Sequence, residues 1–245
     1  METFNVVSAG AAQAVVVRLL QNLQLENAGL SVNTRYGAVQ AMKACVVDGQ
    51  AADVVVLTDS LIDELIEKNF ILAGSRRDLG AVGTGIAVRA GLPLPDVGSA
   101  QALRAALLAC SRVVCPDPAT ATAGKVLLQV LDQLGISAHM LPRLHCCSSG
   151  YEAMAQLACG TGPHEIGVMQ MTEIIASPDV WLAGPLPGGL QATTVYSAAV
   201  AAQSASPERA SQFIQRLTAQ KDVLRAAGFG DCPVPAETLV LQSIQ

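Results

Sequence analysis

The chain has 245 residues, of which 51% are hydrophobic and 14% charged, and its formal net charge is −5. A chain of this length buries a substantial core, in one large domain or two smaller ones. The weak negative charge excludes a general electrostatic field for nucleic acid or for an anionic membrane surface. Aromatic residues are only 3% of the chain, which argues against stacking platforms for bases or sugars.

The N-terminus and the cysteines bear on where the protein works. An apolar strand pattern begins at Phe4, with no basic segment, long apolar segment or cleavage site before it. No apolar run reaches the length of a membrane span. The seven cysteines are an odd number, and several fall in apolar patterns where a free thiol behaves as a small hydrophobe. We therefore expect a reduced, cytoplasmic protein, with a periplasmic one as the alternative if a leader has been removed.

Strand and helix patterns alternate along the first third of the chain. Strands are expected at 4–7, 30–36 and 52–57, and helices at 11–25, 37–47 and 60–68. The third strand is apolar throughout, as in a parallel sheet buried on both faces. Asp59 or Ser60 is expected to cap the helix that follows it. This alternation predicts a parallel, doubly wound sheet with right-handed crossovers.

The rest of the chain continues the alternation, interrupted by a turn-rich connector at 91–96. Further strands are expected at 85–90, 112–115, 141–147 and 166–169, a long apolar run at 194–202, and helices at 100–109, 151–159, 208–219 and 221–227. Ser99 is the expected cap of the helix that begins at residue 100. The last two helices have no strand series of their own. They are therefore predicted to pack back onto the first α/β unit.

One junction, residues 116–125, suggests the kind of ligand. It joins an apolar strand pattern to a helical pattern through small residues and two threonines. The first N–H groups of a helix lack intrahelical partners and lie at the positive end of its dipole, which suits an anion. Similar junctions follow other strands of the chain, and their recurrence predicts a shared anion site.

Four segments resemble the molybdate-type periplasmic solute-binding proteins. These are Gly49 to Val56, Asp117 to Thr120 with Ala123-Gly124, Gly167 to Glu173, and the Ala-Ala-Gly-Phe ending at Phe229. The resemblance covers nearly the whole chain in order. It implies the α/β fold of the type II periplasmic-binding-protein kind, with two doubly wound parallel or mixed-sheet lobes joined by two crossing strands. The implied lobes are 1–86 with 195–245, and 87–194, with the ligand cleft between them.

Two departures from the molybdate pattern bear on the ligand. The second loop of the first lobe reads Gly37-Ala38-Val39-Gln40 where that family places a serine, and Gln170 stands where it places a tyrosine. These residues argue against a site tuned to a tetrahedral oxyanion. The segments 88–91 and 184–187, with Pro95-Asp96, resemble the branch of the superfamily that includes aconitate isomerase, an enzyme.

Loops at the carboxyl ends of the strands are expected to meet in the cleft. Their backbone N–H groups and hydroxyls would bind a carboxylate or oxyanion, although a hydroxyl at such a place also caps helices in the ordinary way. Arg77 or Arg35 could supply a bidentate contact to a carboxylate, whereas Lys43 and Lys125 are expected at the surface. The predicted ligand-binding residues are Ser8, Ala9, Gly10, Gly37, Ala38, Val39, Arg77, Ala119, Thr120, Ala121, Thr122, Ser148, Ser149, Gly150, Tyr151, Gln170 and Met171.

The catalytic residues, if there are any, stay open. His145 precedes Cys146, but successive residues of a strand point to opposite faces and do not form a nucleophile pair. Cys146-Cys147 also lacks the spacing of a zinc site, so no metal and no cofactor are expected. An isomerase would need a base near an acidic C–H group. The candidates for that base are His145, Glu173, Tyr36 and Tyr151.

The sequence therefore predicts a solute-binding-type protein that closes on a small anion by hinge motion. An organic carboxylate is the expected ligand, and neither nucleic acid nor membrane insertion is expected. One alternative is an isomerase of the aconitate type on the same scaffold. A further alternative is the molybdate- or oxyanion-binding component of an ABC transporter.

Overall fold

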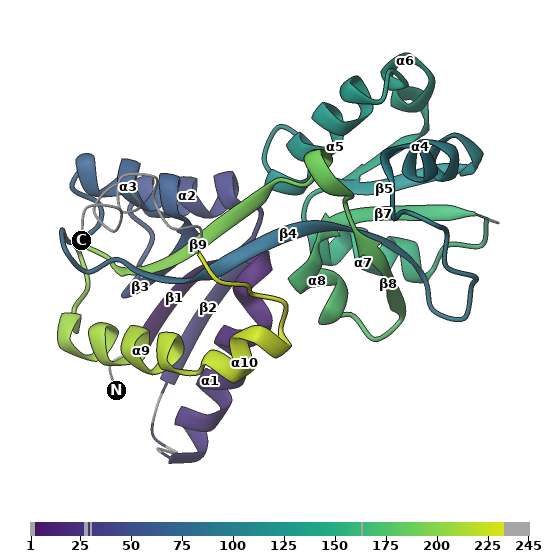
Figure 1. Ribbon diagram of the computed structural model, residues 1–245. Coiled ribbons are helices and arrows are strands. Elements are labelled where there is room, and N and C mark those ends of the chain that lie inside the picture. The colour runs from purple at the N-terminus through teal and green to yellow at the C-terminus, as the bar shows by residue number, and fades with distance from the viewer. Residues whose placement is uncertain (1–2, 27–28, 30, 163, 233–245) are drawn as a thin grey trace, which may run out of the picture.

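The computed structural model describes residues 3–26, 29, 31–162 and 164–232. Leu30, the predicted first residue of the second strand, lies outside these residues, as does the 233–245 part of the predicted first lobe. The strands follow the order β2-β1-β3-β9-β4-β7-β5-β6, with β8 paired to β4. The chain forms two lobes that share the long strand β4 (Figure 1).

The elements alternate much as the sequence predicts. The strands are β1 (Thr3–Ala9), β2 (Ser31–Gly37), β3 (Val54–Thr58), β4 (Arg77–Arg89), β5 (Arg112–Pro116), β6 (Leu144–Cys147), β7 (Glu165–Gln170), β8 (Val180–Pro185) and β9 (Thr193–Val200). The helices are η1 (Gly10–Ala12), α1 (Gln13–Glu26), α2 (Val39–Val47), α3 (Asp59–Glu67), α4 (Ala100–Ala109), α5 (Thr122–Gln133), α6 (Ser137–Met140), η2 (Leu141–Arg143), α7 (Gly150–Ala158), α8 (Met171–Ile175), η3 (Gly188–Leu190), α9 (Pro207–Ala219) and α10 (Lys221–Ala226).

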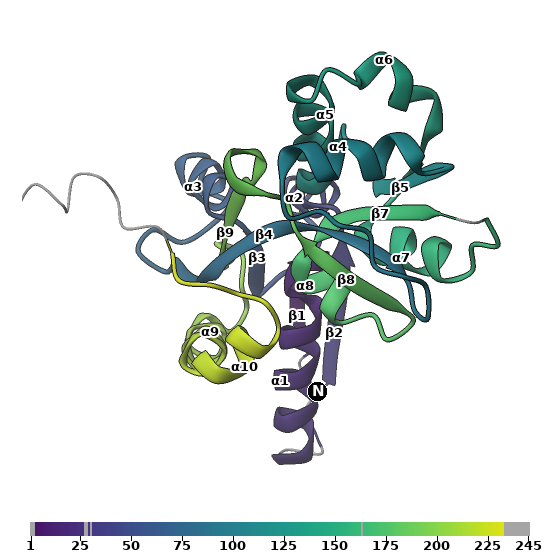
Figure 2. The same ribbon diagram turned by 45° about the vertical axis from the view of Figure 1, so that its right-hand side comes forward.

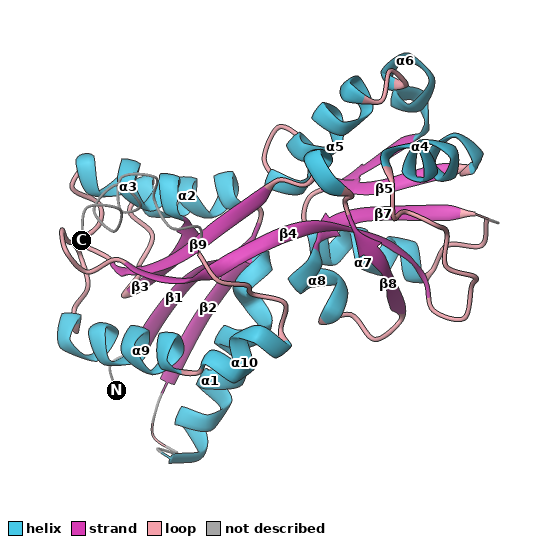
Figure 3. Cartoon of the chain, viewed as in Figure 1, coloured by secondary structure: helices cyan, strands magenta, loops and turns pink. Residues whose placement is uncertain are grey.

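Lobe 1 is built on the parallel strands β2, β1 and β3, to which β9 and the first half of β4 add antiparallel pairs. Helices cover both faces of this sheet, α2 and α3 on one side and α1, α9 and α10 on the other (Figure 3). One hydrophobic core joins residues from 4–82 to residues from 196–229. The C-terminal helices therefore pack onto lobe 1, as predicted, and Figure 2 shows α9 and α10 beside it.

Lobe 2 has a sheet of its own, in which β6, β5 and β7 are parallel and β4 and β8 antiparallel. Two hydrophobic clusters cover its faces. One cluster includes residues of α4, α5 and α6, and the other includes residues of α7 and α8. The predicted α/β fold, with two mixed-sheet lobes and two crossing strands, is confirmed. The predicted boundaries at 86/87 and 194/195 stay predictions.

The two crossing strands are β4 and β9. β4 is 13 residues long; its first half pairs with β9 and its second half with β7 and β8. The sequence predicted only its last part, 85–90, because Gly80 and Gly83 interrupt the alternation of apolar residues before it. β8 was missed for a similar reason, since its end at Gly184-Pro185 has the composition of a turn.

Some helix and strand ends differ from prediction. Thr58, and not Asp59 or Ser60, caps α3, accepting a hydrogen bond from the Leu61 N–H group. Ser99 caps α4 as predicted. The segment 141–143 is a short helical turn instead of strand, because the proline within it favours the first turn of a helix.

The start of α5 packs against the end of β5 so closely that Gly124 has no room for a side chain. A Cβ atom there would lie 2.7 Å from Pro118 N and would also meet the Pro116 carbonyl oxygen. Backbone atoms cannot turn aside as a flexible side chain can, so the helix or the strand end would have to move. We predict that Gly124→Ala lowers the free energy of unfolding by about 1–3 kcal/mol, measured by urea denaturation.

Gly189→Ala is the matched control for this substitution. A Cβ atom at Gly189 meets no heavy atom within 4 Å. Its free energy of unfolding should stay within about 0.5 kcal/mol of the unsubstituted chain. Equal stabilities for the two variants would contradict the close packing at Gly124.

Candidate functional site

A small cavity of about 20 Å³ lies where the two lobes meet. That volume accommodates about one water molecule, so the lobes are nearly closed around it. The backbone N–H group of Gln40 in lobe 1 donates a 3.2 Å hydrogen bond to the Thr120 carbonyl oxygen in lobe 2, which joins the lobes beside the cavity. The lining residues are Ala9, Gly10, Ala11, Gly37, Ala38, Val39, Pro116, Ala121, Thr122, Ala123, Gly150, Gln170, Glu173 and Tyr196.

Several helices begin at this cavity without a side-chain cap. The N-cap residues are Ala9 for η1, Ala38 for α2, Ala121 for α5 and Gln170 for α8, and none of these side chains accepts a hydrogen bond from its helix. Side-chain caps occur both at the cavity, where Ser149 caps α7, and elsewhere, where Thr58 and Ser99 cap α3 and α4, while α9 and α10 also begin uncapped. Uncapped helix starts leave backbone N–H groups and positive dipole ends for a ligand. The cavity therefore presents the donors of both lobes to one small space.

Gln170 places an amide group in the cavity wall. Its side chain is 3% exposed, and neither its Nε2 nor its Oε1 atom has a hydrogen-bond partner among the described residues. Leaving a buried polar atom without a partner costs about 1–3 kcal/mol, and native structures contain few such atoms. A buried amide that lacks protein partners beside a cavity suggests a polar ligand.

Two threonine hydroxyls near Gln170 are also buried without a hydrogen-bond partner among the described residues. Thr84 of β4 is the cross-strand partner of Gln170, so the two side chains share a face of the sheet. The hydroxyls of Thr84 and of Thr172 are buried and find no partner in the part of the chain that the structure describes. Four of the seven buried polar atoms without a partner among the described residues thus gather where β7 meets the crossing strand, and the other three belong to Tyr36, Gln50 and Arg112.

Glu173 lies between the two lobes. A Cβ atom at Gly10, in lobe 1, would lie 2.6 Å from Glu173 Oε1, and one at Gly150, in lobe 2, would overlap the same carboxyl group. The carboxyl group also accepts a hydrogen bond from the backbone N–H of Gln170, the N-cap residue of its own helix. That bond is half of a capping box. Glycine at positions 10 and 150 thus makes room for the carboxyl group.

Burial raises the pKa of Glu173 to about 7, against the smaller opposing effect of the Gln170 hydrogen bond. Tyr151 and Tyr196 lie near enough to interact with it electrostatically. Burial raises the pKa of Tyr151 to about 12, with further contributions from Glu173 and Tyr36. Burial also raises the pKa of Tyr36 and of Tyr196. Near neutral pH the tyrosines are neutral, and Glu173 is the group that changes charge.

About half of the predicted ligand-binding residues line the cavity. Those that do are Ala9, Gly10, Gly37, Ala38, Val39, Ala121, Thr122, Gly150 and Gln170. Tyr151 is adjacent, its ring 3.6 Å from a Cβ atom built at Gly10, whereas Met171 packs against Gly83 of the crossing strand. Whether these residues bind the ligand stays a prediction.

Four predicted hydroxyls are used elsewhere. Ser8 donates to the Ala9 carbonyl oxygen, and the Thr120 hydroxyl is placed toward the Asp117 carbonyl oxygen at 3.5 Å. Ser148 bonds to the Glu152 carboxylate, and Ser149 accepts from the Glu152 N–H group as the cap of α7. These side chains and Ala119 do not line the cavity. Helix capping and local turns, the alternative to ligand binding, account for the hydroxyls of Ser148 and Ser149.

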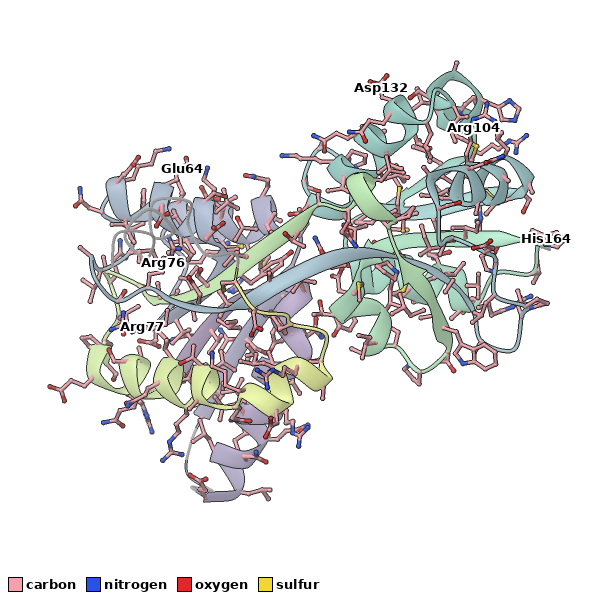
Figure 4. The ribbon with its side chains drawn as sticks, viewed as in Figure 1. Glu64, Arg76, Arg77, Arg104, Asp132 and His164 are labelled. Carbon is pink, nitrogen blue, oxygen red and sulfur yellow. The ribbon has the colours of Figure 1, made fainter. Side chains whose placement is uncertain are left out.

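The predicted cation is absent from the described lining. Arg77 donates to the carbonyl oxygens of Gly74 and Arg76, and Figure 4 shows it on lobe 1, far from the junction of the lobes. Arg35 and Lys125 are exposed, and Lys43 pairs with Glu64 at 2.6 Å. The prediction that Arg77 reaches the cleft is wrong because the residue begins β4 at the end remote from lobe 2.

The residues predicted as candidate catalytic bases do not all lie at the cavity. Glu173 lines the cavity and Tyr151 adjoins it, whereas His145 lies near Glu152 and outside the lining. No group of three or more His, Cys, Asp or Glu side chains in the described residues could hold a metal ion. Likewise, none of the described helices is long and apolar enough to cross a membrane.

Sequence reasoning missed several lining residues. Tyr196, on β9, is 1% exposed, and its side chain interacts with that of Thr122. A lone tyrosine in the apolar run 194–202 is the signal that could have identified it. Pro116 and Ala123 belong to the junction 116–125, and Ala11 ends the loop after the first strand, so the sequence placed these segments at the cleft without selecting the three residues themselves.

Comparisons with known proteins identify relatives of the chain. Residues 4–230 match the family described as bacterial extracellular solute-binding protein. Aconitate isomerase from Pseudomonas sp. is 30% identical over 207 residues, which are 81% of this chain and 74% of that protein. The description of the family as extracellular agrees with the periplasmic alternative. It does not support the cytoplasmic location predicted above.

Solved structures share the fold. The periplasmic molybdate-binding protein of Azotobacter vinelandii superposes with a TM-score of 0.76 at 22% identity, covering 95% of this chain and 99% of that one. The sulfate-binding protein SubI of Mycobacterium tuberculosis gives a TM-score of 0.67 at 20% identity, covering 99% of this chain and 91% of that one.

The raised pKa of Glu173 makes stability depend on pH. Between its ordinary value of 4.5 and about 7, the unfolded chain releases the proton while the folded chain keeps it. The stability contributed by the protonated group is therefore full below about pH 4.5 and is lost as pH rises to 7. We predict that Glu173→Gln, which stays neutral, gains about 3 kcal/mol relative to the unsubstituted chain between pH 4.5 and 8.

Urea denaturation at several pH values measures this difference. Glu67→Gln, a substitution of an exposed acid on α3, should follow the unsubstituted chain at every pH. A Glu173→Gln curve parallel to that of the unsubstituted chain would show that the carboxyl group keeps its ordinary pKa.

Proposed function

The chain belongs to the family of bacterial extracellular solute-binding proteins, and from that premise we propose that it closes its two lobes on a small organic carboxylate. The crossing strands β4 and β9 would act as the hinge. The ligand would lie in the cavity between η1, α2, α5 and α8, whose N-termini supply backbone donors.

One observation carries the proposal, namely the Gln170 amide, buried at the cavity with neither polar atom partnered. An apolar side chain of similar shape would fill the same space without the cost of unpaired polar atoms. The amide is therefore best explained by a ligand with which it exchanges hydrogen bonds. Thr84 and Thr172 beside it support the same conclusion.

The surroundings favour an anion over a neutral ligand. The uncapped helix starts at Ala38 of lobe 1 and Ala121 of lobe 2 both line the cavity, so positive dipole ends from the two lobes lie at the same small space. In the described lining no lysine or arginine supplies a counter-charge. Recognition by oriented backbone donors suits a small, delocalised negative charge.

The donor set favours a planar carboxylate over a tetrahedral oxyanion. Of the predicted hydroxyls, only that of Thr122 lines the cavity, and Ser8 is already committed to Ala9 O. A carboxylate presents two oxygens, whereas a tetrahedral oxyanion presents four and needs more donors. At about 20 Å³ the cavity has space for about one water molecule, so binding of a carboxylate requires the lobes to stand further apart.

A second candidate function is isomerisation of a small polycarboxylate on the same scaffold. The 30% identical relative named aconitate isomerase favours it, and so does Glu173, a carboxyl group in the cavity wall with a pKa near 7. A group that gains and loses a proton near neutral pH suits general acid–base catalysis. Turnover distinguishes the candidates, because both require the same binding site.

Proton NMR of trans-aconitate with the protein in deuterated buffer tests turnover. An isomerase should exchange deuterium into the substrate or form the cis isomer, and the Glu173→Gln variant should lose that activity. Saturable binding without deuterium exchange and without the cis isomer would contradict the isomerase function and support the binding function.

The Gln170 amide gives a prediction that separates stability from binding. We predict that Gln170→Leu stabilises the ligand-free protein, because it removes unpaired buried polar atoms, and weakens anion binding by about 1–3 kcal/mol. Thermal unfolding and isothermal calorimetry with trans-aconitate and molybdate as probes measure the two effects.

Gln191→Leu is the matched control. The Gln191 amide is satisfied, since it accepts from the Thr84 N–H at 3.0 Å and donates to the Thr84 carbonyl oxygen at 2.9 Å. Its loss should destabilise the protein. A Gln170→Leu protein that is less stable than Gln191→Leu, or that binds as well as the unsubstituted chain, would contradict the ligand role of Gln170.

A further inference from the structure

Glu173 is an acid inside a site that the proposed function gives to an anion. Its carboxyl group is placed against Gly10 of lobe 1 and Gly150 of lobe 2, in the wall of the cavity that Gln170 also lines. The residue is only 6% exposed. An ionised Glu173 and an anionic ligand would therefore be held together in one small, dehydrated space.

The groups that face Glu173 offer no compensation for two negative charges. Tyr151 of α7 and Tyr196 of β9 lie beside it, Tyr36 of β2 lies near Tyr151, and none of these tyrosines carries a positive charge at any pH. The start of η1 contributes glycine and alanine only. Among the residues described at the cavity there is no lysine, arginine or histidine. Two like charges sharing a site force one of them to take up a proton.

Resting on the proposed function, we propose that Glu173 is protonated when the anion is bound and donates that proton in a hydrogen bond to a ligand oxygen. Binding of a fully ionised anion then takes up a proton whenever the free protein has lost it. Glu173 acts in this way as a specificity residue, because it favours ligands that present an oxygen without hydrogen at its position.

The arrangement has a consequence for the lobes as well. Glycines of both lobes adjoin the same carboxyl group, so its charge acts electrostatically on both walls of the cavity. A neutral Glu173 allows the lobes to close on the anion, whereas an ionised one opposes closure by repelling it. A purely structural Glu173, acting only as the half capping box of α8, would show no such coupling.

Calorimetry of binding between about pH 7 and 9 tests the coupling, with molybdate and trans-aconitate as probes. The affinity of the unsubstituted protein should fall by up to tenfold for each pH unit in this range. In two buffers of different ionisation enthalpy, binding at pH 8 should take up close to one proton. Glu173→Gln keeps the shape and the donor but cannot ionise, so its affinity should be nearly independent of pH.

Glu67→Gln is the control and should retain the pH dependence of the unsubstituted chain. If the unsubstituted protein and Glu173→Gln bind a probe with the same pH profile, or without proton uptake, the coupling is overturned and the anion site stands. If the unsubstituted protein binds neither probe at any pH, the anion-binding function and the coupling both fail.

Discussion

The central constraint on this structure is that the backbone N–H groups at several helix N-termini meet in a buried space and need hydrogen-bond acceptors there. The N-termini at Ala9, Ala38, Ala121 and Gln170 lack side-chain caps and line one small cavity between the lobes. Backbone N–H groups without partners are costly inside a protein. These donors already lie together in the nearly closed structure, and we propose that an anionic ligand accepts their hydrogen bonds. Such a requirement would make the closure of the lobes responsive to the ligand.

Two polar residues at the junction of the lobes lower the stability of the fold and serve the proposed binding function. Gln170 leaves two polar atoms unpartnered among the described residues, and burial of Glu173 raises its pKa and so disfavours its ionised form. An apolar residue at either position would give a more stable fold. Their neighbour Gln191 shows the contrast, since both of its amide atoms are bonded to the backbone of Thr84. Buried polar groups without partners thus support the proposed site, whereas the Gln191 amide bonds to the crossing strand β4.

The fold was largely predictable from sequence, and the site only in part. Periodic apolar runs such as 52–57 located most strands, but two glycines concealed most of the crossing strand β4. The loops of both lobes were found because small residues before a helix mark a strand end. Which side chains enter the cavity was not readable: Ser148 and Arg77 find local partners, whereas Tyr196 reaches it from a distant strand. Such choices are made by tertiary packing, which local sequence does not encode.

Amide chemical-shift mapping tests the anion site most directly. During titration with trans-aconitate and with molybdate, the largest shifts should fall on the backbone N–H groups of Gly10, Val39 and Thr122 and on the side-chain amide of Gln170. These groups come from both lobes and surround the cavity. Saturable shifts confined to another surface, such as the groove beside Arg77 and Ser211, would contradict the account.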